Sequence, residues 1–433
     1  MTTRALLSTI ALCALLQACG GGGGGSNGGS AAPAAQASAP VAASAPASAS
    51  AAAPASAPSP SASAPDADTT VPQSTTPNVQ TIEVTRTSTN TRNMLRTSVT
   101  ICVPGTGTCQ TIDDIQVDTG SHGLRVLASA LDPSIALPLV AGSGTNAVVA
   151  ECAVFGSGYT WGTVRAADVH MAGHVASSTS VQLIADSAAP NTAQDCTESG
   201  LPMLSASSLR GNGILGVGPF TADCGAGCAA SAMPRWYYSC ISGNCVASTL
   251  AVARQVTNPV ANFAADNNGV LIELPNVPDG GASSVTGTMT FGIGSQSNNL
   301  LGSAIVLKSS STTGYVTTAF GGSQYGSSFI DSGSNGVFFP STTLARCGAW
   351  YCPSTPQTIA ATILSSSGAQ SAVSFTVAQS TALFGTGNFA FDNLAGPASG
   401  YFDWGLPFFY GRRVFTALSG RPTPAGAGPY YAF

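Results

Sequence analysis

The stretch SSFIDSGSNGVFFP, residues 327–340, places an acidic residue between two apolar runs. Asp331 follows Phe329 and Ile330, and a turn that contains Gly separates it from the apolar residues 337–339. A carboxylate beside buried strands is costly unless a partner stabilises it. The first question about this chain is therefore which group pairs with Asp331.

A second copy of the same pattern lies in the other half of the chain. The stretch DDIQVDTGSHGLRVLAS, residues 113–129, also reads as an apolar strand, Asp, Thr or Ser, Gly, Ser, two variable residues and a second apolar strand. One such loop is a weak signal in a chain rich in Ser, Thr and Gly, whereas two copies with matching flanks are much stronger. We predict that Asp331 pairs with Asp118.

The chain from residue 78 onward has the pattern of a β protein. Apolar and polar residues alternate in short runs that Ser, Gly, Asn and Pro separate. The runs are VQTIEVTR (79–86), LRTSVTIC (95–102), DDIQVD (113–118), LRVLAS (124–129), GTVRAADVHMAG (162–173), VQLIAD (181–186), GVLIELP (269–275), GTMTFGIG (287–294), SAIVLK (303–308), AVSFTVA (372–378) and RRVFTAL (412–418). Residues 245–266 and 341–347 are the best candidates for short helices. The chain from residue 78 onward is longer than the usual size of a domain with one hydrophobic core. We therefore expect two β lobes, residues 78–285 and 286–433.

Composition indicates an exported protein. Only 8% of the 433 residues are charged and 44% are hydrophobic, whereas about a quarter of the residues are charged in an average domain. The net charge is −5 and no basic stripe is present, so a nucleic acid partner is not expected. We expect a monomer without a cofactor.

The N-terminus has the features of a targeting segment. Arg4 precedes the apolar run ALLSTIALCALLQAC, which is typical of a signal peptide over residues 1–18. The ending LQAC resembles a bacterial lipobox, so Cys19 is expected to carry lipid; the alternative is an ordinary signal with a chance Cys. Gly20 after this Cys indicates the outer membrane, facing the periplasm or the exterior.

The segment after Cys19 is rich in Gly and then in Ala, Pro and Ser. Such a composition cannot bury enough apolar surface to fold, so residues 19–77 are expected to be a lipidated Cys followed by a disordered tether. No later run of about 18 apolar residues exists, and the lipid is therefore the only expected membrane contact.

Ten Cys residues remain after Cys13 and Cys19, and an even number in an exported chain indicates disulfides. Short spacing suggests Cys102–Cys109, Cys240–Cys245 and Cys347–Cys352, and elimination leaves Cys152–Cys196 and Cys224–Cys228. Zinc is the competing interpretation, but the spacings form no two CxxC pairs and His occurs only at 122, 170 and 174. We expect no metal site.

At the two Asp loops the chain resembles the pepsin-like aspartic peptidases. Four further segments are similar to motifs of that family, and they occur in the family's order. They are the flap hairpin VFGSGYTWGTVRAADVHMAG (154–173), the strand behind the first Asp loop NGILGVG (212–218), the segment GTMTFGIGSQ (287–296) that opens the second lobe, and the closing segment WGLPFFYGRRVFTAL (404–418). The layout also resembles that of a little-characterised group of bacterial exported proteins, which would form a lipoprotein branch of this fold.

The resemblance implies an all-β, two-lobed acid-protease fold with a cleft between the lobes and a polypeptide as substrate. Asp118 and Asp331 would be the catalytic pair, and the small residues beside them would support it: Thr119, Gly120, Ser121, Ser332, Gly333 and Ser334. The flap would comprise Phe155, Gly156, Ser157, Gly158 and Tyr159.

Three positions depart from the family's pattern. Phe155 stands where the family has a flap Tyr; Tyr159 or Trp161 are candidates to replace it, and the alternative is a flap that only covers the cleft. His122 stands where Ser is usual; the alternatives are a ring that becomes charged beside the two acids at acid pH and a ring that faces solvent, and we expect the second. Asp403 replaces an apolar residue before Trp404.

The chemistry of a carboxyl pair follows from its electrostatics. Two carboxylates about 3 Å apart share one proton, so one can accept a proton from water while the other polarises a peptide carbonyl. A membrane-tethered aspartic endopeptidase is the leading interpretation. The alternatives are a catalytically silent protein of this fold that binds an extended peptide or glycan, as an adhesin or assembly factor, and a β protein whose two loops are ordinary Asx turns.

Overall fold

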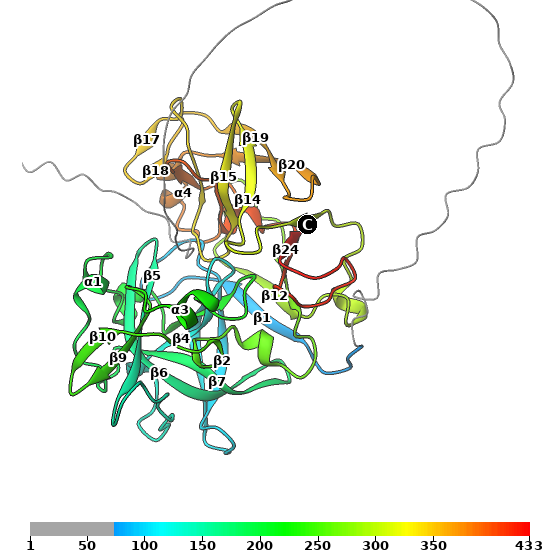
Figure 1. Ribbon diagram of the computed structural model, residues 1–433. Helices are drawn as coiled ribbons and strands as arrows, with labels where there is room; N and C mark the ends of the chain where they lie inside the picture. Colours follow the sequence, from blue (N-terminus) through cyan, green and yellow to red (C-terminus); the bar gives the residue numbers. More distant parts are fainter. Residues whose placement is uncertain (1–72) are drawn as a thin grey trace, which may run out of the picture. The chain divides into compact units, whose positions relative to one another are not determined.

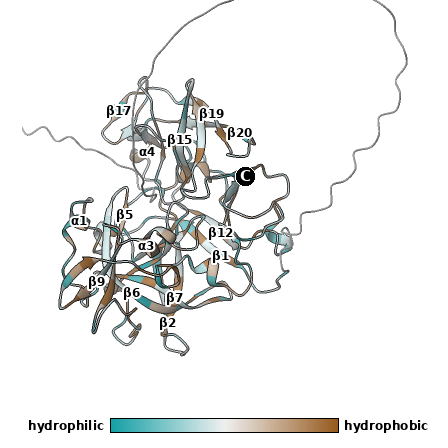
Figure 2. Ribbon diagram, viewed as in Figure 1, coloured by the Kyte–Doolittle hydropathy of each residue, from teal (hydrophilic) through white to brown (hydrophobic). Residues whose placement is uncertain are grey.

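The structure is a computed structural model that describes residues 73–433, and β-strands dominate it (Figure 1). The strands carry both polar and apolar residues, as Figure 2 shows by colour. Every alternating run identified in the sequence overlaps a strand. The all-β fold class is therefore confirmed.

The strands of the N-terminal half are β1 Val79–Val84, β2 Arg96–Cys102, β3 Cys109–Asp118, β4 His122–Leu127, β5 Val148–Phe155, β6 Gly158–Met171, β7 His174–Ile184, β8 Gly213–Val217, β9 Tyr237–Ile241, β10 Asn244–Ala247 and β11 Gly269–Glu273. Those of the C-terminal half are β12 Val285–Phe291, β13 Val306–Lys308, β14 Val316–Phe320, β15 Ser323–Ile330, β16 Val337–Phe339, β17 Arg346–Cys347, β18 Trp350–Tyr351, β19 Gln357–Leu364, β20 Gln370–Val377, β21 Ala395–Pro397, β22 Asp403–Trp404, β23 Arg413–Ala417 and β24 Tyr430–Ala432.

The helices are short. The α-helices are α1 Gln194–Thr197, α2 Ala206–Leu209, α3 Ala226–Ala230 and α4 Ser380–Gly385. The 3₁₀ helices are η1 Ala128–Ala130, η2 Val252–Arg254, η3 Pro259–Asn262, η4 Ser297–Asn299 and η5 Leu406–Phe408.

The two segments expected to contain short helices differ in outcome: 245–266 contains only short 3₁₀ helices, and the expectation for 341–347 is wrong. Residues 245–266 form part of β10 and the two 3₁₀ turns η2 and η3, because Asn258 caps Val260 and Pro259 starts a new turn. Residues 341–347 form no helix, because the Ser341 hydroxyl accepts hydrogen bonds from the Thr343 and Leu344 amides. Such local side-chain bonds compete with helix formation.

One large sheet joins the two halves of the chain. It has 15 strands in the order β10-β9-β5-β6-β7-β4-β8-β3-β2-β1-β12-β11-β23-β24-β13. A second sheet of seven strands, β20-β19-β14-β15-β22-β16-β21, belongs to the C-terminal half, and β17 and β18 form a third. The expected boundary between residues 285 and 286 falls at the start of β12, which pairs with β1 and β11 of the N-terminal half.

The two Asp loops sit in matching strand arrangements. In the first, β8 lies between β3 and β4, parallel to β3 and antiparallel to β4. In the second, β22 lies between β15 and β16, parallel to β15 and antiparallel to β16. The internal repeat in the sequence therefore corresponds to a repeated unit of three strands.

The main hydrophobic core runs through both halves. One cluster contains Ile82 and Val117 from the N-terminal half together with Ile330 and Trp404 from the C-terminal half, and all four are fully buried. The Asp loops are thus anchored at their strand ends by a common core.

All five expected disulfides are present, namely Cys102–Cys109, Cys152–Cys196, Cys224–Cys228, Cys240–Cys245 and Cys347–Cys352. Disulfides persist in oxidising compartments, so the chain is an exported protein. Within residues 73–433, no helix has both the length and the apolar character that a membrane crossing requires.

The last five residues of the expected tether, 73–77, lie within the described part of the chain and contact the folded domain. The Ser74 amide donates to the Ser295 carbonyl at 3.1 Å, and the Gln296 side chain donates to the Thr76 carbonyl at 2.7 Å. The domain therefore begins before residue 78. The expected signal peptide, Cys19 and the rest of the tether lie outside the described residues.

Candidate active site

Asp118 is the last residue of β3, and the turn after it binds its carboxylate. The Gly120 amide donates to Asp118 Oδ1 at 2.8 Å, and the Ser121 hydroxyl donates to Oδ2 at 2.5 Å. Both bonds favour a fixed orientation of the carboxyl group, which is 7% exposed.

Asp331 follows the last residue of β15 and has the same partners. The Gly333 amide donates to its Oδ1 at 2.7 Å, and the Ser334 hydroxyl donates to its Oδ2 at 2.8 Å. The two halves of the chain therefore hold their Asp side chains with equivalent atoms in equivalent places.

Reciprocal hydrogen bonds lock the two loops together. The Thr119 hydroxyl donates to the Ile330 carbonyl at 3.0 Å and accepts from the Ser332 amide at 2.9 Å. The Ser332 hydroxyl donates to the Val117 carbonyl at 2.9 Å and accepts from the Thr119 amide at 3.1 Å. Thr119 and Ser332 are fully buried, so these bonds fix the two strand ends relative to each other.

Two more side chains cross from the N-terminal half to the second loop. Gln116 donates to the Gly333 carbonyl at 2.8 Å, and Asn93 donates to the Asn335 carbonyl at 2.9 Å. Asn335 in turn donates to the Asn93 carbonyl at 3.1 Å. Side chains of the N-terminal half therefore hold the second Asp loop in place, and the loop donates a hydrogen bond in return.

The absence of side chains at Gly120 and Gly333 lets each loop approach the opposite acid. A Cβ at Gly120 would lie 2.6 Å from Asp331 Cγ, and one at Gly333 would lie 2.6 Å from Asp118 Oδ1. These separations are too short for any real side chain. The structure thus brings Asp118 and Asp331 together, with each loop in close contact with the opposite carboxyl group.

The electrostatics of this pair favour a shared proton. Burial raises the pKa of Asp331 well above its usual value, and the neighbouring charges of Asp118 and Asp403 raise it further. Two acids in contact cannot both ionise at low cost, so they titrate as a pair. The arrangement can therefore hold a proton on Asp331.

The flap residues form the tip of the β5–β6 hairpin. Phe155 pairs with Gly158 across a two-residue turn of Gly156 and Ser157. The Phe155 ring lies 5.7 Å from the Arg125 guanidinium carbon. The flap hairpin expected from the sequence therefore exists, with a Phe and no phenol at its end.

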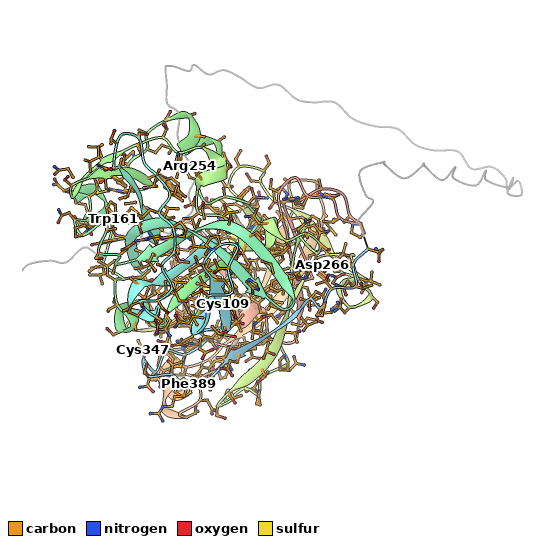
Figure 3. All side chains as sticks on the ribbon, turned by 90° about the horizontal axis from the view of Figure 1, so that it is seen from below. Cys109, Trp161, Arg254, Asp266, Cys347 and Phe389 are labelled. Carbon is orange, nitrogen blue, oxygen red and sulfur yellow. A yellow bond between two sulfur atoms is a disulfide. The ribbon has the colours of Figure 1, made fainter. Side chains whose placement is uncertain are left out.

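Neither aromatic residue suggested as a substitute for the flap Tyr is free to act as one. Trp161, labelled in Figure 3, is 2% exposed and donates its indole N–H to the Ala189 carbonyl at 2.9 Å. Tyr159 is 5% exposed and belongs to the same hydrophobic cluster as the Cys152–Cys196 disulfide. That suggestion is therefore wrong, because both rings are needed to fill this cluster.

The expectation that His122 faces solvent is also wrong. Its Nε2 is buried without a hydrogen-bond partner, and its ring packs edge-on against Phe220 with centroids 5.2 Å apart. Burial, together with the charge of Arg125, lowers the pKa of His122 to about 3. A neutral imidazole therefore lies beside the first Asp loop.

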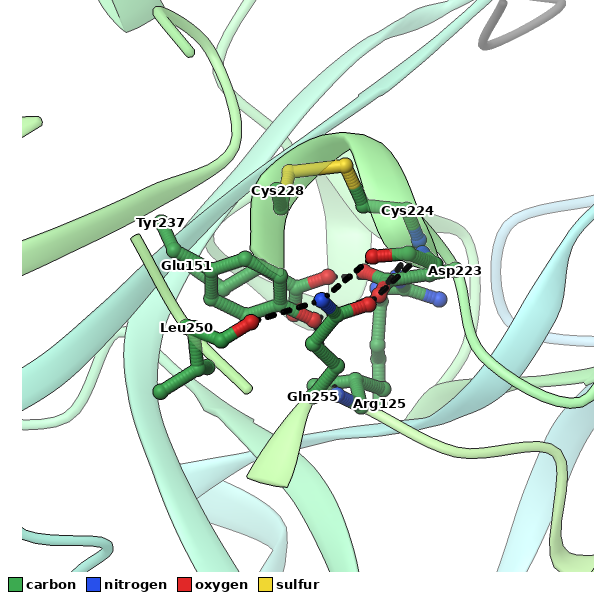
Figure 4. The surroundings of a disulfide bond; sticks show 10 residues. Arg125, Glu151, Asp223, Cys224, Cys228, Tyr237, Leu250 and Gln255 are labelled. Carbon is green, nitrogen blue, oxygen red and sulfur yellow. Dashed lines mark hydrogen bonds and ion pairs between the residues drawn. A yellow bond between two sulfur atoms is a disulfide. The ribbon is translucent and has the colours of Figure 1, made fainter. Parts of the chain in front are cut away.

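A buried ionic cluster supports the first Asp loop from behind (Figure 4). Arg125 donates to Glu151 at 2.5 Å and to Asp223 at 3.2 Å, and its other terminal nitrogen donates to the His122 carbonyl at 2.7 Å. Burial and the charge of Glu151 raise the pKa of Asp223 well above its usual value. One guanidinium thus serves two acids and holds the chain just after Ser121.

The Cys224–Cys228 disulfide and two polar side chains complete this cluster. Tyr237 donates its hydroxyl to Asp223 Oδ1 at 2.5 Å, and Gln255 bonds to both the amide and the carbonyl of Gly225. The disulfide therefore fixes the loop that carries Asp223 (Figure 4). The sequence gives no signal for this cluster, since its members are far apart in the chain.

Two residues of the site were not identified from the sequence. Asp403 was noted only as a departure from the pattern, but it is 5% exposed and its charge raises the pKa of Asp331. Tyr431, near the end of the chain, is 2% exposed, and burial and then Asp331 raise its pKa. The sequence feature that could have identified Asp403 is an acidic residue in an otherwise apolar segment. No comparable sequence feature points to Tyr431.

Among residues 73–433, no group of three or more His, Cys, Asp or Glu side chains is arranged to bind a metal ion. His170 and His174 lie on the two adjoining strands β6 and β7, and His174 contacts Asp266 with 3.2 Å between Nε2 and Oδ2. The ten Cys of the domain are all in disulfides.

Comparison with known proteins identifies the family of this chain but does not assign an activity to it. A search of curated proteins finds no match to this chain. Residues 74–433 match the family described as "Protein of unknown function (DUF3443)". This match covers nearly the whole described domain, including both Asp loops, and the chain therefore belongs to the DUF3443 family.

Proposed function

We propose that this protein is an aspartic endopeptidase that hydrolyses peptide bonds in exported or extracellular polypeptides. Asp118 is the ionised member of the pair and accepts a proton from the attacking water. Asp331 holds the shared proton and polarises the carbonyl of the scissile bond. No covalent intermediate is required.

The observation that supports this proposal most strongly is the symmetric support of the two acids. Each accepts one backbone and one hydroxyl hydrogen bond from its own loop, and Thr119 and Ser332 join the loops reciprocally. Two ordinary Asx turns would need neither this reciprocity nor contact between the two carboxyl groups. Preorganisation of this kind is what acid–base catalysis on a bound water demands.

The test is cleavage of an unfolded protein as a function of pH. We expect cleavage at acid pH, its inhibition by a statine-type peptide, and a loss of about 10²–10⁴-fold in the Asp331→Asn variant. Asp113→Asn is the matched control, because Asp113 lies on the same strand as Asp118 and its side chain is exposed. Equal rates for wild type and Asp331→Asn, both folded, would contradict the dyad mechanism.

A second candidate is a catalytically silent protein that binds an extended peptide or glycan between its lobes. The observation in its favour is the flap, where Phe155 offers no hydroxyl and Tyr159 and Trp161 are buried. In that case, binding of a peptide would survive in Asp331→Asn, and wild type would release no cleavage products at any pH.

Lipid attachment at Cys19 and anchoring to the outer membrane are part of the proposal. The LQAC sequence supports them, and the disulfides agree with a location outside the cytoplasm. A Cys19→Ala variant should leave the membrane fraction and lose incorporation of labelled palmitate. Retention of label in that variant would refute lipidation at this residue.

A further inference from the structure

Arg92 lies in the loop between β1 and β2, next to the second Asp loop. Asn90 and Asn93, on either side of it, have φ values of 52° and 46°, in a region that Asn adopts more readily than most residues. The Asn335 side chain, in the turn after Asp331, donates to the Arg92 carbonyl. The fold therefore fixes Arg92 beside the turn that holds the second acid.

The Arg92 guanidinium lies over two aromatic rings of the C-terminal half. Its central carbon is 5.1 Å from the centroid of the Phe384 ring and 5.6 Å from that of the Phe389 ring. Phe384 belongs to α4, and both Arg92 and Phe384 are half-buried. The attraction between a cation and aromatic faces grows as water is removed. The two rings therefore hold the guanidinium in place while part of its surface stays exposed.

The positive charge of Arg92 has no acidic partner within residues 73–433, where it takes part in none of the ion pairs. Its side chain donates to the Asn90 carbonyl at 3.3 Å and to the Phe384 carbonyl at 3.5 Å. Both bonds are long, because N–H···O bonds are usually about 2.9 Å. Its Nε is buried without a hydrogen-bond partner among these residues. The guanidinium therefore keeps most of its capacity to donate hydrogen bonds.

The other arginines of the described domain that are not exposed have stronger partners. Three of them form ion pairs with acids, namely Arg96, Arg125 and Arg165. Arg412 and Arg421 donate to carbonyls at 2.7 and 2.8 Å. Burial removes water from a charge, and Arg92 regains less of that interaction from protein groups than the others do. Its charge is therefore the one most open to a carboxylate from outside the chain.

Aromatic rings continue from this cation toward the strand after the second Asp loop. The Phe384 ring lies 5.9 Å from that of Trp350, and the Trp350 ring lies 5.5 Å from that of Phe338 on β16. All three side chains are half-buried. Aromatic rings offer a large apolar area to a ligand. An acid bound by Arg92 would have this apolar area beside it, which fits a polypeptide better than a small anion.

We propose that Arg92 is a specificity-determining residue, which binds an Asp or Glu side chain of the polypeptide substrate several residues from the bond to be cleaved. A guanidinium gives a carboxylate two parallel N–H···O bonds, which a neutral amide side chain cannot accept in the same way. An extended chain advances about 3.3 Å per residue, so a few residues take it from the carboxyl pair to the turn at Asn335. The effect on cleavage rests on the proposed peptidase function, whereas the binding of an acidic peptide does not.

Cleavage of matched peptides tests the preference. A peptide that wild type cleaves is remade with Glu at each position in turn and again with Gln, so that the members of each pair differ by one charge. At one position, kcat/KM should be about tenfold higher for Glu than for Gln, and Arg92→Gln should bring this ratio to one. Arg86→Gln is the matched control, because Arg86 is exposed in the same loop, and it should keep the ratio. No position with a Glu preference, or the same preference in folded Arg92→Gln, would overturn the inference.

Arg92→Lys decides the question if Arg92→Gln does not fold. Lys keeps the charge and a long apolar stem but has no planar fork. The ratio of kcat/KM between the Glu and Gln peptides should therefore fall below that of wild type. An unchanged ratio would overturn the two-bond contact between Arg92 and the carboxylate.

Binding to the Asp331→Asn protein separates this inference from the proposed function. Measured by fluorescence anisotropy, the Glu peptide should bind about tenfold more tightly than its Gln partner, and adding Arg92→Gln should make the two affinities equal. Equal affinities in Asp331→Asn itself, or no binding of either peptide, would overturn the inference. If wild type cleaves no peptide at any pH, the peptidase function is rejected, and this ratio of affinities alone decides the role of Arg92.

Discussion

At the scale of single residues, the centre depends on groups that are small or uncharged. Gly120 and Gly333 give each carboxyl room against the opposite loop, and Thr119 and Ser332 use short hydroxyls to join the two. His122 fits the same rule, because its Nε2 is buried beside the loop and the ring is neutral. Changes in side-chain size and in charge should therefore have separate and measurable effects.

Gly120→Ala tests the need for space. The added methyl would meet the Asp331 carboxyl at 2.6 Å, so that acid must move, and we expect a loss of about 1–3 kcal/mol in stability together with loss of any cleavage. Gly326→Ala is the control, since nothing lies within 4 Å of that position. Thermal unfolding and the cleavage assay measure both. A Gly120→Ala protein as stable and active as the Gly326→Ala protein would contradict the contact.

His122→Asn tests the buried imidazole through pH. The pKa of His122 is about 3 in the folded protein and near 6.5 when unfolded, so its contribution to stability is complete above pH 6.5 and is lost as the pH falls toward 3. Between pH 7 and pH 4 the wild type should lose about 2–3 kcal/mol that the variant does not lose. Denaturant unfolding at both pH values gives the difference. If wild type and variant lose the same stability between pH 7 and pH 4, the His122 ring is exposed to solvent.

At the scale of elements, each Asp loop depends on the strand behind it. Gly216 of β8 and Gly405 after β22 allow these strands to pass within contact of the loops, since a Cβ would lie 2.6 Å from the His122 amide or 2.1 Å from the Gly336 carbonyl. The first loop has the Arg125 cluster as an additional support, whereas the second has Asn93. The two repeats thus share their strands and differ in the polar groups that hold them.

Arg125→Met tests the ionic support. It leaves Glu151 and Asp223 buried without their cation, so we expect a loss of about 3–5 kcal/mol at pH 7. The loss should be smaller at pH 4, where the two acids can take protons. Arg413→Met removes an exposed pair with Glu273 and should cost under about 1 kcal/mol. Similar losses in the two variants, or no relief by acid, would show that charge burial does not control this region.

At the scale of the whole molecule, the described residues agree with the two-lobed β fold expected from the sequence, and one sheet is shared by the two halves of the chain. The 15-stranded sheet passes from β1 to β12 and from β11 to β23, so strands from both halves alternate in it. This shared sheet connects the strands that carry the two acids. We expect that neither half of the chain keeps its Asp loop in this arrangement without the other half.

A cut between the halves tests this continuity. A specific protease site inserted after Gly280, which is exposed in the loop between β11 and β12, should be cleaved without separating the fragments. The paired strands should keep both pieces together in size-exclusion chromatography under native conditions and release them only in denaturant. Elution of two separate fragments without denaturant would show that the lobes are independent.

Much of this architecture could be predicted from the sequence, because it depends on local sequence patterns. Alternation predicted the strands, the repeated Asp-Thr/Ser-Gly-Ser loops predicted the strand ends, and Cys spacing predicted all five disulfides. Each of these depends on neighbours in the chain or on an internal repeat. The helix expected over residues 341–347 failed because the Ser341 hydroxyl binds local amides, whereas residues 245–266 form only short 3₁₀ helices.

The sequence by itself determined that this protein is an exported, disulfide-rich β protein with two equivalent acidic loops. Only the tertiary structure decided the environment of each charged group: that the Nε2 of His122 is buried, that Arg125 serves two acids, and that Asp403 is buried on the strand behind the second Asp loop. The physical reason is that a strand pattern specifies which face a residue lies on, whereas the cost of a charge depends on distant segments that remove its water and supply or withhold its partner.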